Sequence, residues 1–96
     1  MSSPQASRIV TVVNRQGLHA RCAMDLAKLA RTFRSRIVVI KGDRRADATS
    51  VMELLTLGAD HGEQLWLEAT GDDAEAALAA VSDLFARGFG EEEEMD

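Results

Sequence analysis

Hydrophobic residues follow two different spacings along the chain, and together these predict alternating strands and helices. Runs of β-branched or alternating apolar residues predict four strands, over residues 8–14, 37–41, 45–48 and 65–69. Apolar residues three and four positions apart predict three helices, over residues 19–33, 51–58 and 73–87. The order strand, helix, strand, strand, helix, strand, helix favours an α+β fold. We expect an open-faced sandwich, in which three helices cover one face of a four-stranded, mainly antiparallel sheet.

The alternation in the last predicted strand indicates which side chains face the helices. Leu65 and Leu67 are apolar and alternate with polar neighbours, so we expect both to point into the core. Trp66 then lies on the open face of the sheet. A large apolar patch there would be unusual for a monomer, which suggests self-association through this face or cover by the C-terminal tail.

Length and charge limit the classes of protein to which the chain can belong. Ninety-six residues allow one domain, which we place at residues 8–88, after an N-terminal extension (1–7) and before an acidic tail (89–96), both expected to be disordered. The net charge of −5 comes largely from that tail, and no basic stripe indicates nucleic-acid binding. No apolar run approaches the roughly 20 residues of a membrane span, so we expect no membrane insertion.

A single cysteine, Cys22, cannot form a disulfide within the chain. This agrees with a reducing compartment, and we expect the protein to be cytoplasmic.

The segment Gly17-Leu18-His19-Ala20-Arg21 places a histidine at the predicted start of the first helix. Free backbone N–H groups and the positive end of the helix dipole attract an anion there, and Arg21 can add a bidentate partner. Imidazole can act as a nucleophile towards a phosphoryl group. The alternative is that His19 merely caps the helix while Arg21 is a solvated surface charge, and spacing alone does not decide between the two.

A second signal precedes the short middle helix. Ser50 is followed three residues later by Glu53, which matches the capping box that begins many helices. Ser50 is therefore interpreted first as a structural N-cap.

Together these two segments resemble the signatures of the HPr family, the histidine-containing phosphocarriers of the bacterial phosphoenolpyruvate-dependent sugar phosphotransferase system. Gly17 to Arg21, followed by Ala23, is similar to the active-site signature. The segment from Thr49 to Gly58 is similar to the second signature, around the regulatory serine. The predicted element order also agrees with that βαββαβα fold from about residue 8 to residue 87.

The resemblance implies a function and a set of partners. His19 would carry the phosphoryl group on Nδ1 as a phosphohistidine, beside Arg21, and Ser50 would match the regulatory phosphosite. Enzyme I would pass the phosphoryl group from phosphoenolpyruvate to this carrier, and the carrier would deliver it to enzyme II A components for sugar uptake. The chain would thus be no enzyme in its own right and would need no cofactor. An apolar docking surface near the histidine would include Met24, Val51, Met52 and Leu55.

Two departures from the family pattern affect these expectations. Cys22 stands where the family usually has proline, either as a small structural replacement or as a thiol made reactive by the helix N-terminus. Glu53 stands where it would repel a phosphate on Ser50, which argues against an HPr kinase/phosphorylase as a further partner.

Other functions remain open at this stage. A regulatory or nitrogen-type phosphorelay would use the same His19 chemistry to control other proteins. An enzyme using Cys22 and His19 would lack an orienting third group. A metal site formed by His19, Cys22 and His61 would lack a second ligand pair, so no metal is expected. A pure interaction module would have no use for His19.

Overall fold

The computed structural model describes residues 5–91 and places seven regular elements in the predicted order. The strands are β1 (Gln5–Thr11), β2 (Arg36–Lys41), β3 (Arg44–Asp47) and β4 (Gln64–Thr70). The helices are α1 (Ala20–Ala30), α2 (Val51–Thr56) and α3 (Ala74–Ala86), and a short 3-10 helix, Gly88–Gly90, follows them. Each predicted element is present, with its ends shifted by a few residues.

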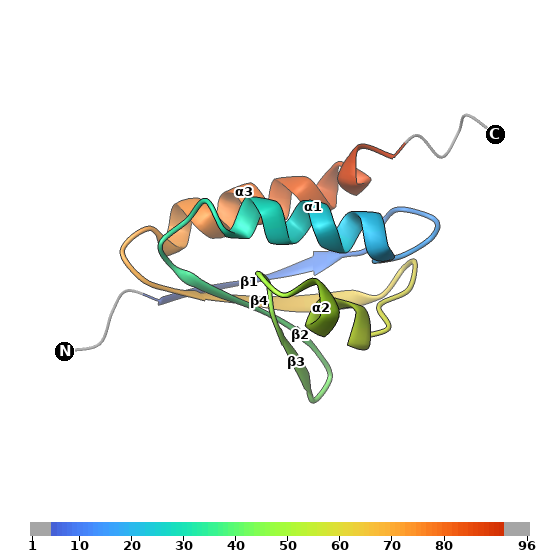
Figure 1. The fold of residues 1–96 in the computed structure, drawn as a ribbon, viewed down its shortest axis with the longest axis horizontal. Coiled ribbons are helices and arrows are strands. Elements are labelled where there is room, and N and C mark those ends of the chain that lie inside the picture. Colours follow the sequence, from blue (N-terminus) through green and yellow to red (C-terminus); the bar gives the residue numbers. More distant parts are fainter. Residues whose placement is uncertain (1–4, 92–96) are drawn as a thin grey trace.

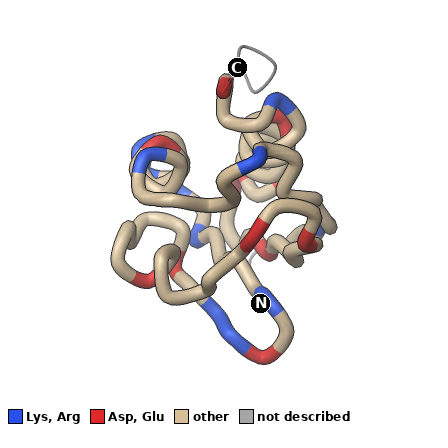
Figure 2. The backbone as a smooth tube through the Cα atoms, turned by 90° about the vertical axis from the view of Figure 1, so that its right-hand side faces the viewer, with Lys and Arg blue, Asp and Glu red and all other residues tan. Residues whose placement is uncertain are grey.

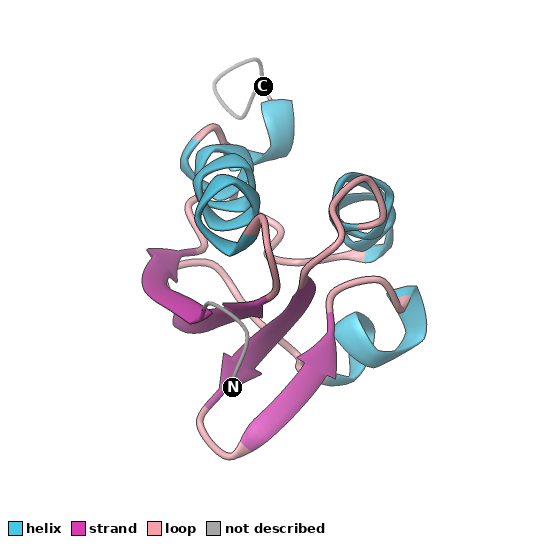
Figure 3. Cartoon of the chain, turned by 90° about the vertical axis from the view of Figure 1, so that its left-hand side faces the viewer, coloured by secondary structure: helices cyan, strands magenta, loops and turns pink. Residues whose placement is uncertain are grey.

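The four strands form one antiparallel sheet in the order β1-β4-β2-β3. The helices all lie on the same side of this sheet, as Figures 1 and 3 show. The predicted open-faced α+β architecture is thereby confirmed.

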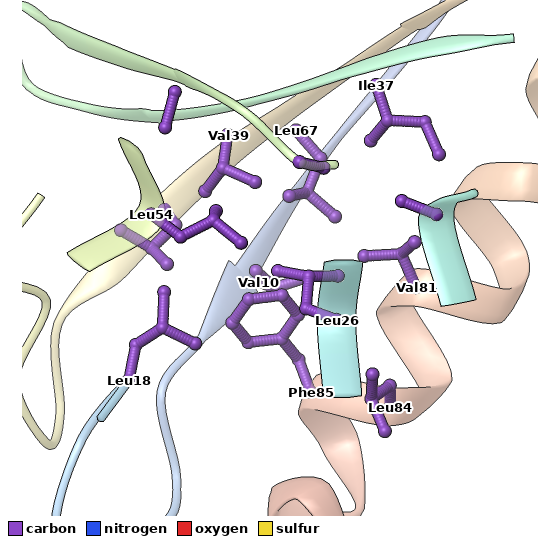
Figure 4. Close-up of a cluster of buried hydrophobic side chains, with 14 of the residues drawn as sticks. Val10, Leu18, Leu26, Ile37, Val39, Leu54, Leu67, Val81, Leu84 and Phe85 are labelled. Carbon is purple, nitrogen blue, oxygen red and sulfur yellow. The ribbon is translucent and has the colours of Figure 1, made fainter. Parts of the chain in front are cut away.

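The core fills the space between the sheet and the helical layer (Figure 4). Its largest fully buried side chains come from every layer of the fold, and include Leu26, Ile37, Leu54, Leu67, Leu78 and Phe85. Leu65 and Leu67 both face the helices, as the alternation in β4 predicted, since each is almost completely buried. Burial of such side chains contributes roughly 1.5–3 kcal/mol each and drives the packing of α1 and α3 on the sheet.

The opposite face of the sheet exposes a row of apolar side chains. Trp66 pairs in register with Ile9 on one side and with Ile40 on the other. Trp66 is 41% exposed and Ile9 is 56% exposed, which confirms that Trp66 points away from the helices. Residues 89–91 of the C-terminal tail leave α3 on the helical side, so this part of the tail does not cover the face (Figure 1).

Both ends of the domain lie outside the boundaries that the sequence suggested. β1 begins at Gln5, so residues 5–7 belong to the sheet and not to a disordered extension. At the other end the chain stays packed through residues 89–91, where Phe89 is buried, although disorder was expected from residue 89. The expectations for residues 1–4 and 92–96 lie outside the described residues.

Asp73 is the residue that precedes α3, but its side chain does not cap the helix. Its side chain makes no hydrogen bond to the first turn. Instead the carboxylate accepts hydrogen bonds from the backbone N–H of Arg34 (2.9 Å) and from Ser35, through the backbone N–H (2.8 Å) and the hydroxyl (2.6 Å). Asp73 therefore connects the start of α3 to the segment that leads into β2.

Among residues 5–91, no helix has both the length and the apolar character that a membrane crossing needs. In the view of Figure 2, basic and acidic positions are interspersed along the chain and do not gather into one basic stripe.

Candidate functional site

The loop after β1 brings His19 to the start of α1 by a tight turn at Gly17. This glycine has φ +74°, a conformation that L side chains rarely adopt. A Cβ added there would lie 2.6 Å from the carbonyl oxygen of Ala59, so the loop packs closely on the segment before β4. The N–H of Leu18 donates to that same carbonyl at 2.9 Å. The close approach fixes the residue just before His19 against the body of the domain.

His19 occupies the N-cap position of α1, but its ring does not cap the helix. The side chain makes no hydrogen bond to the first turn, whose first helical bond runs from the N–H of Ala23 to the carbonyl of His19. The side chain is 27% exposed. The imidazole therefore does not act as a side-chain cap of α1.

The carboxylate of Glu91 lies against the imidazole, a contact that the sequence did not predict. Glu91 Oε2 is 2.6 Å from His19 Nε2 and also accepts a hydrogen bond from Arg21 Nη2 at 2.6 Å. The Glu91 side chain is only 12% exposed, whereas that of Arg21 is 68% exposed. A largely buried carboxylate and a solvent-exposed guanidinium thus meet beside the histidine.

The segment after α3 delivers Glu91 to this position. Gly88, Phe89 and Gly90 all have positive φ values, between 59° and 75°, which turn the chain back towards α1. For Phe89 this conformation is unfavourable, at about 1–2 kcal/mol. The ring compensates by packing edge-to-face on Phe85, with ring centroids 4.9 Å apart, where it is almost fully buried. Phe89 is therefore the anchor that holds the terminal segment in place.

Two buried residues complete the cluster. Cys22 has no exposed surface, and its Sγ lies 3.4 Å from His19 Nε2 and 3.6 Å from Glu91 Oε2. Asn14 is also fully buried. Its Nδ2 lies within hydrogen-bond distance of the carbonyl of Gly17 (2.6 Å), of Glu91 Oε1 (3.2 Å) and of Cys22 Sγ (3.6 Å).

The environment keeps the Cys22 thiol neutral and the Glu91 carboxylate ionised. Burial, together with the neighbouring Glu91 carboxylate, raises the pKa of Cys22 to about 12, so this thiol is protonated at neutral pH. Burial opposes ionisation of Glu91 too, but hydrogen bonds from Arg21 and His19 outweigh it and lower the pKa of Glu91 to about 2. The thiol is therefore not the activated nucleophile that its place near a helix N-terminus allowed.

An ionised carboxylate can only accept hydrogen bonds, which decides the direction of its bond to the histidine. Nε2 must carry the proton that is shared with Glu91. In the neutral ring the lone pair then resides on Nδ1, which is the nitrogen available for nucleophilic attack.

The three side chains do not form the relay of a cysteine hydrolase. In such a relay the thiol and the orienting carboxylate contact opposite nitrogens of the imidazole. Here Cys22 and Glu91 both approach Nε2. Glu91 does supply a third group, which the sequence had not indicated, but in a geometry that does not activate the thiol.

The remaining predicted residues lie around α2. Ser50 is the N-cap of α2, and its Oγ accepts a hydrogen bond from the N–H of Glu53 at 3.2 Å. The carboxylate of Glu53 does not return to Ser50 as in a complete capping box, but accepts from the N–H of Asp47 at 2.8 Å. His61, the third ligand in the metal site considered from the sequence, is exposed and is not part of the cluster.

The predicted docking residues differ in exposure. Met24, on α1, is 56% exposed, and Met52 and Leu55, on α2, are 75% and 40% exposed. Val51 is partly buried and packs against the core. Because α1 and α2 pack against each other, the exposed residues lie on neighbouring helices.

Sequence reasoning missed Asn14, Phe89 and Glu91. Asn14 was interpreted as the end of a strand, and Glu91 as the first residue of a solvated acidic run. One signal in the sequence indicated that the chain stays packed after the last helix. Phe89, a large apolar residue, lies between two glycines directly after that helix, whereas a disordered tail is typically polar.

The chain is similar to known phosphocarrier proteins. Residues 6–87 match the family described as "PTS HPr component phosphorylation site". The chain is 43% identical to the phosphocarrier protein NPr of Shewanella violacea over 84 residues, which cover 88% of this chain and 92% of that protein. It is 38% identical to the phosphocarrier protein HPr of Cupriavidus necator over 86 residues, 90% of this chain and 97% of that protein.

The fold is similar to a solved member of the same family. The crystal structure of HPr-C-His from Thermoanaerobacter tengcongensis superimposes with a TM-score of 0.87 at 38% sequence identity, and the match covers 91% of this chain and 98% of that one. Sequence and structure thus agree over most of the domain, and the chain belongs to the HPr family of phosphocarrier proteins.

Proposed function

We propose that the chain is a cytoplasmic carrier that takes a phosphoryl group onto Nδ1 of His19 from an enzyme I protein. The position of His19 supports this proposal most directly. Its ring lies at the N-terminus of α1, free of any capping bond, with Arg21 two residues further on. In the transfer, the bond from phosphorus to the donor breaks as the bond to Nδ1 forms, and Arg21 and the helix N-terminus stabilise the transferred charge.

The carboxylate of Glu91 is important to this chemistry because it binds the groups that a phosphoryl group needs. Its bond to Nε2 keeps the proton away from Nδ1. It also holds Arg21 through Nη2, and the exposure of Arg21 leaves that side chain free to turn towards a phosphate. The carrier is thus proposed to exchange one anionic partner of Arg21 for another on phosphorylation.

Docking to enzyme I and to enzyme II A components is proposed to use Met24, Met52 and Leu55. Val51 is proposed to belong to the same surface, although it is partly buried and packs against the core. These residues form an apolar surface on α1 and α2 next to the histidine, which fits a transient protein partner. Ser50 is proposed to act as a helix cap and not as a regulatory phosphosite, because a phosphate there would face Glu53.

Between the two branches of the family, we propose the nitrogen-type regulatory branch, with sugar uptake as the second candidate. The observation that favours the first is the higher identity to an NPr protein, 43% against 38% for an HPr protein. Phosphorylation rates with an enzyme I of each branch separate them, since the cognate donor should act much faster. A preference for the sugar-branch donor would reverse the assignment.

Intact-mass analysis after incubation with phosphoenolpyruvate and enzyme I tests the carrier chemistry itself. We expect a gain of one phosphoryl group that is lost in mild acid and is absent in His19→Ala. A gain that persists in His19→Ala, or no gain with a donor shown to be active on another carrier, would contradict the proposal.

A further inference from the structure

Three side chains at the proposed phosphorylation site place atoms that can ligate a metal ion close together. His19 Nε2, Cys22 Sγ and a carboxylate oxygen of Glu91 lie within 4.8 Å of one another. We propose that these three atoms bind a borderline-soft divalent cation of the zinc class, and that occupancy of this site and phosphorylation of His19 exclude each other.

The distances between the donor atoms are close to those around a tetrahedral ion. Zinc lies about 2.3 Å from a thiolate and about 2.0–2.2 Å from imidazole nitrogen or carboxylate oxygen, which separates sulfur from either of the others by about 3.5 Å. Here Sγ lies 3.4 Å from Nε2 and 3.6 Å from Oε2. His19 Nε2 and Glu91 Oε2 are 2.6 Å apart. In a tetrahedral zinc site these two atoms would have to move apart by about 0.7 Å.

The surroundings of the cluster also suit a metal. Three protein ligands leave a fourth position open, as in many zinc sites, and a thiolate with a carboxylate neutralises a doubly charged ion. Asn14 is completely buried and directs Nδ2 towards both Glu91 Oε1 and Cys22 Sγ. Such outer hydrogen bonds orient ligands and strengthen metal binding.

Arg21 opposes a cation most directly, since its guanidinium lies 2.6 Å from Glu91 Oε2. The positive end of the α1 dipole opposes it as well. Its side chain is largely exposed and can move into solvent while Asn14 continues to hold the other carboxylate oxygen. The geometry therefore predicts that removal of Arg21 strengthens metal binding, although the same change weakens phosphoryl transfer.

Metal binding would exclude phosphorylation because it changes which nitrogen of the His19 ring carries the proton. When the ion binds, the Cys22 thiol loses its proton to solvent and a sulfur–metal bond forms. The proton on Nε2 moves to Nδ1 as the Nε2 lone pair enters the metal bond. Nδ1 then has no lone pair with which to attack phosphorus. This second half of the inference rests on the proposed function, whereas the metal site itself does not.

Cobalt(II) tests the site directly, because a thiolate ligand gives it a charge-transfer absorption band. The full chain is titrated with Co²⁺ in phosphate-free, reducing buffer, and the zinc affinity of each variant is measured separately by isothermal titration calorimetry. We expect the band in the unmodified protein, no band in Cys22→Ser, and losses of zinc affinity of more than about tenfold in Cys22→Ser, His19→Ala and Glu91→Gln. His61→Ala, which changes the other histidine, should bind as the unmodified protein does, and Arg21→Gln should bind more tightly.

Binding that is unchanged in Cys22→Ser or in Glu91→Gln would overturn the metal site, because the ion would then lie elsewhere. The exclusion is tested separately, by the rate of phosphoryl gain from enzyme I with and without zinc. Zinc should slow the unmodified protein and leave Cys22→Ser unaffected, which also controls for any effect of zinc on enzyme I. Equal slowing of both would contradict the exclusion, and no phosphoryl gain without zinc would contradict the proposed function alone.

Discussion

The carboxylate of Glu91 lies 2.6 Å from Nε2 of His19, although 72 residues separate the two in the chain. The contact places an ionised group at the centre of the proposed phosphorylation site and engages Arg21 at the same time. Its consequences for phosphoryl transfer can be measured by removing the charge, the anchor that positions it, or the turn that positions the histidine.

Removal of the Glu91 charge is expected to accelerate phosphorylation. A carboxylate repels an incoming phosphoryl group and occupies Arg21, and at this distance in a partly solvated site the repulsion is worth on the order of 1 kcal/mol. Glu91→Gln should therefore be phosphorylated about three- to tenfold faster by enzyme I. Glu75→Gln, which removes an exposed charge near the start of α3, is the matched control. Slower transfer in Glu91→Gln would mean that alignment of the ring outweighs the repulsion.

Loss of the Phe89 ring is expected to release the terminal segment. Phe89→Ala removes the contact with Phe85 that compensates an unfavourable backbone conformation, so Glu91 should no longer be held at His19. The phosphorylation rate should then approach that of Glu91→Gln. Urea denaturation should show a stability loss of about 1–3 kcal/mol, below the usual cost for a central core phenylalanine because this segment can detach. An unchanged transfer rate would show that Glu91 is held without Phe89.

Gly17 is expected to tolerate alanine much less well than Gly62. Both have positive φ values, but a Cβ at Gly17 would meet the carbonyl of Ala59 at 2.6 Å, whereas nothing lies within 4 Å of one at Gly62. Gly62→Ala should lose about 1 kcal/mol of stability through its backbone alone, and Gly17→Ala at least about 2 kcal/mol. Chemical denaturation of both variants measures the difference. Equal losses would show that the loop can move away from Ala59.

Asp73 is expected to make the free energy of unfolding vary with pH in the acidic range. Hydrogen bonds from the Ser35 hydroxyl and from the backbone N–H of Arg34 lower the pKa of Asp73 below its ordinary value of 3.8. A carboxyl whose pKa is lower in the folded state contributes stability that is complete above pH 3.8 and is lost as the pH falls below it.

Asp73→Asn should therefore lower the melting temperature at neutral pH, and the difference from the unmodified protein should shrink as the pH falls below 3.8. Thermal denaturation over a series of pH values measures this. Asp72→Asn is the control, because its largely exposed carboxylate makes only a 3.8 Å ion pair with Arg34. A constant difference across the series would assign the effect of Asp73→Asn to geometry and not to ionisation.

Ser50 is expected to act through its cap. Ser50→Ala removes the acceptor for the N–H of Glu53 and should cost about 1 kcal/mol in denaturation, while Ser50→Asp should retain most of the stability because aspartate also caps helices. Stoichiometric modification of Ser50 by an HPr-type serine kinase would instead favour the regulatory role.

The elements of the fold could be predicted because the signals for them are local. The alternation of apolar and polar residues in β4 predicted that Leu65 and Leu67 face the helices and that Trp66 lies on the open face of the sheet. This prediction requires only neighbouring residues in the chain. The start of α1 at His19 and of α2 after Ser50 followed from residues within one turn. Contacts between distant residues could not be predicted in this way. Asp73 directly precedes α3, but its carboxylate accepts from Arg34 and Ser35 and does not cap the helix.

The proposed site divides in the same way. His19 and Arg21 belong to one short segment, so their proximity and the anion-binding end of the helix were determined by the sequence alone, as was the α+β order of elements. Whether the ring would cap the helix or face another group was decided only by the tertiary structure. Glu91 reaches His19 because Phe89 finds a buried position beside Phe85, and Asn14 and Cys22 become its neighbours because the loop packs on Ala59. Such contacts depend on the space that remains once sheet and helices have packed, and no pattern of neighbouring residues encodes that space.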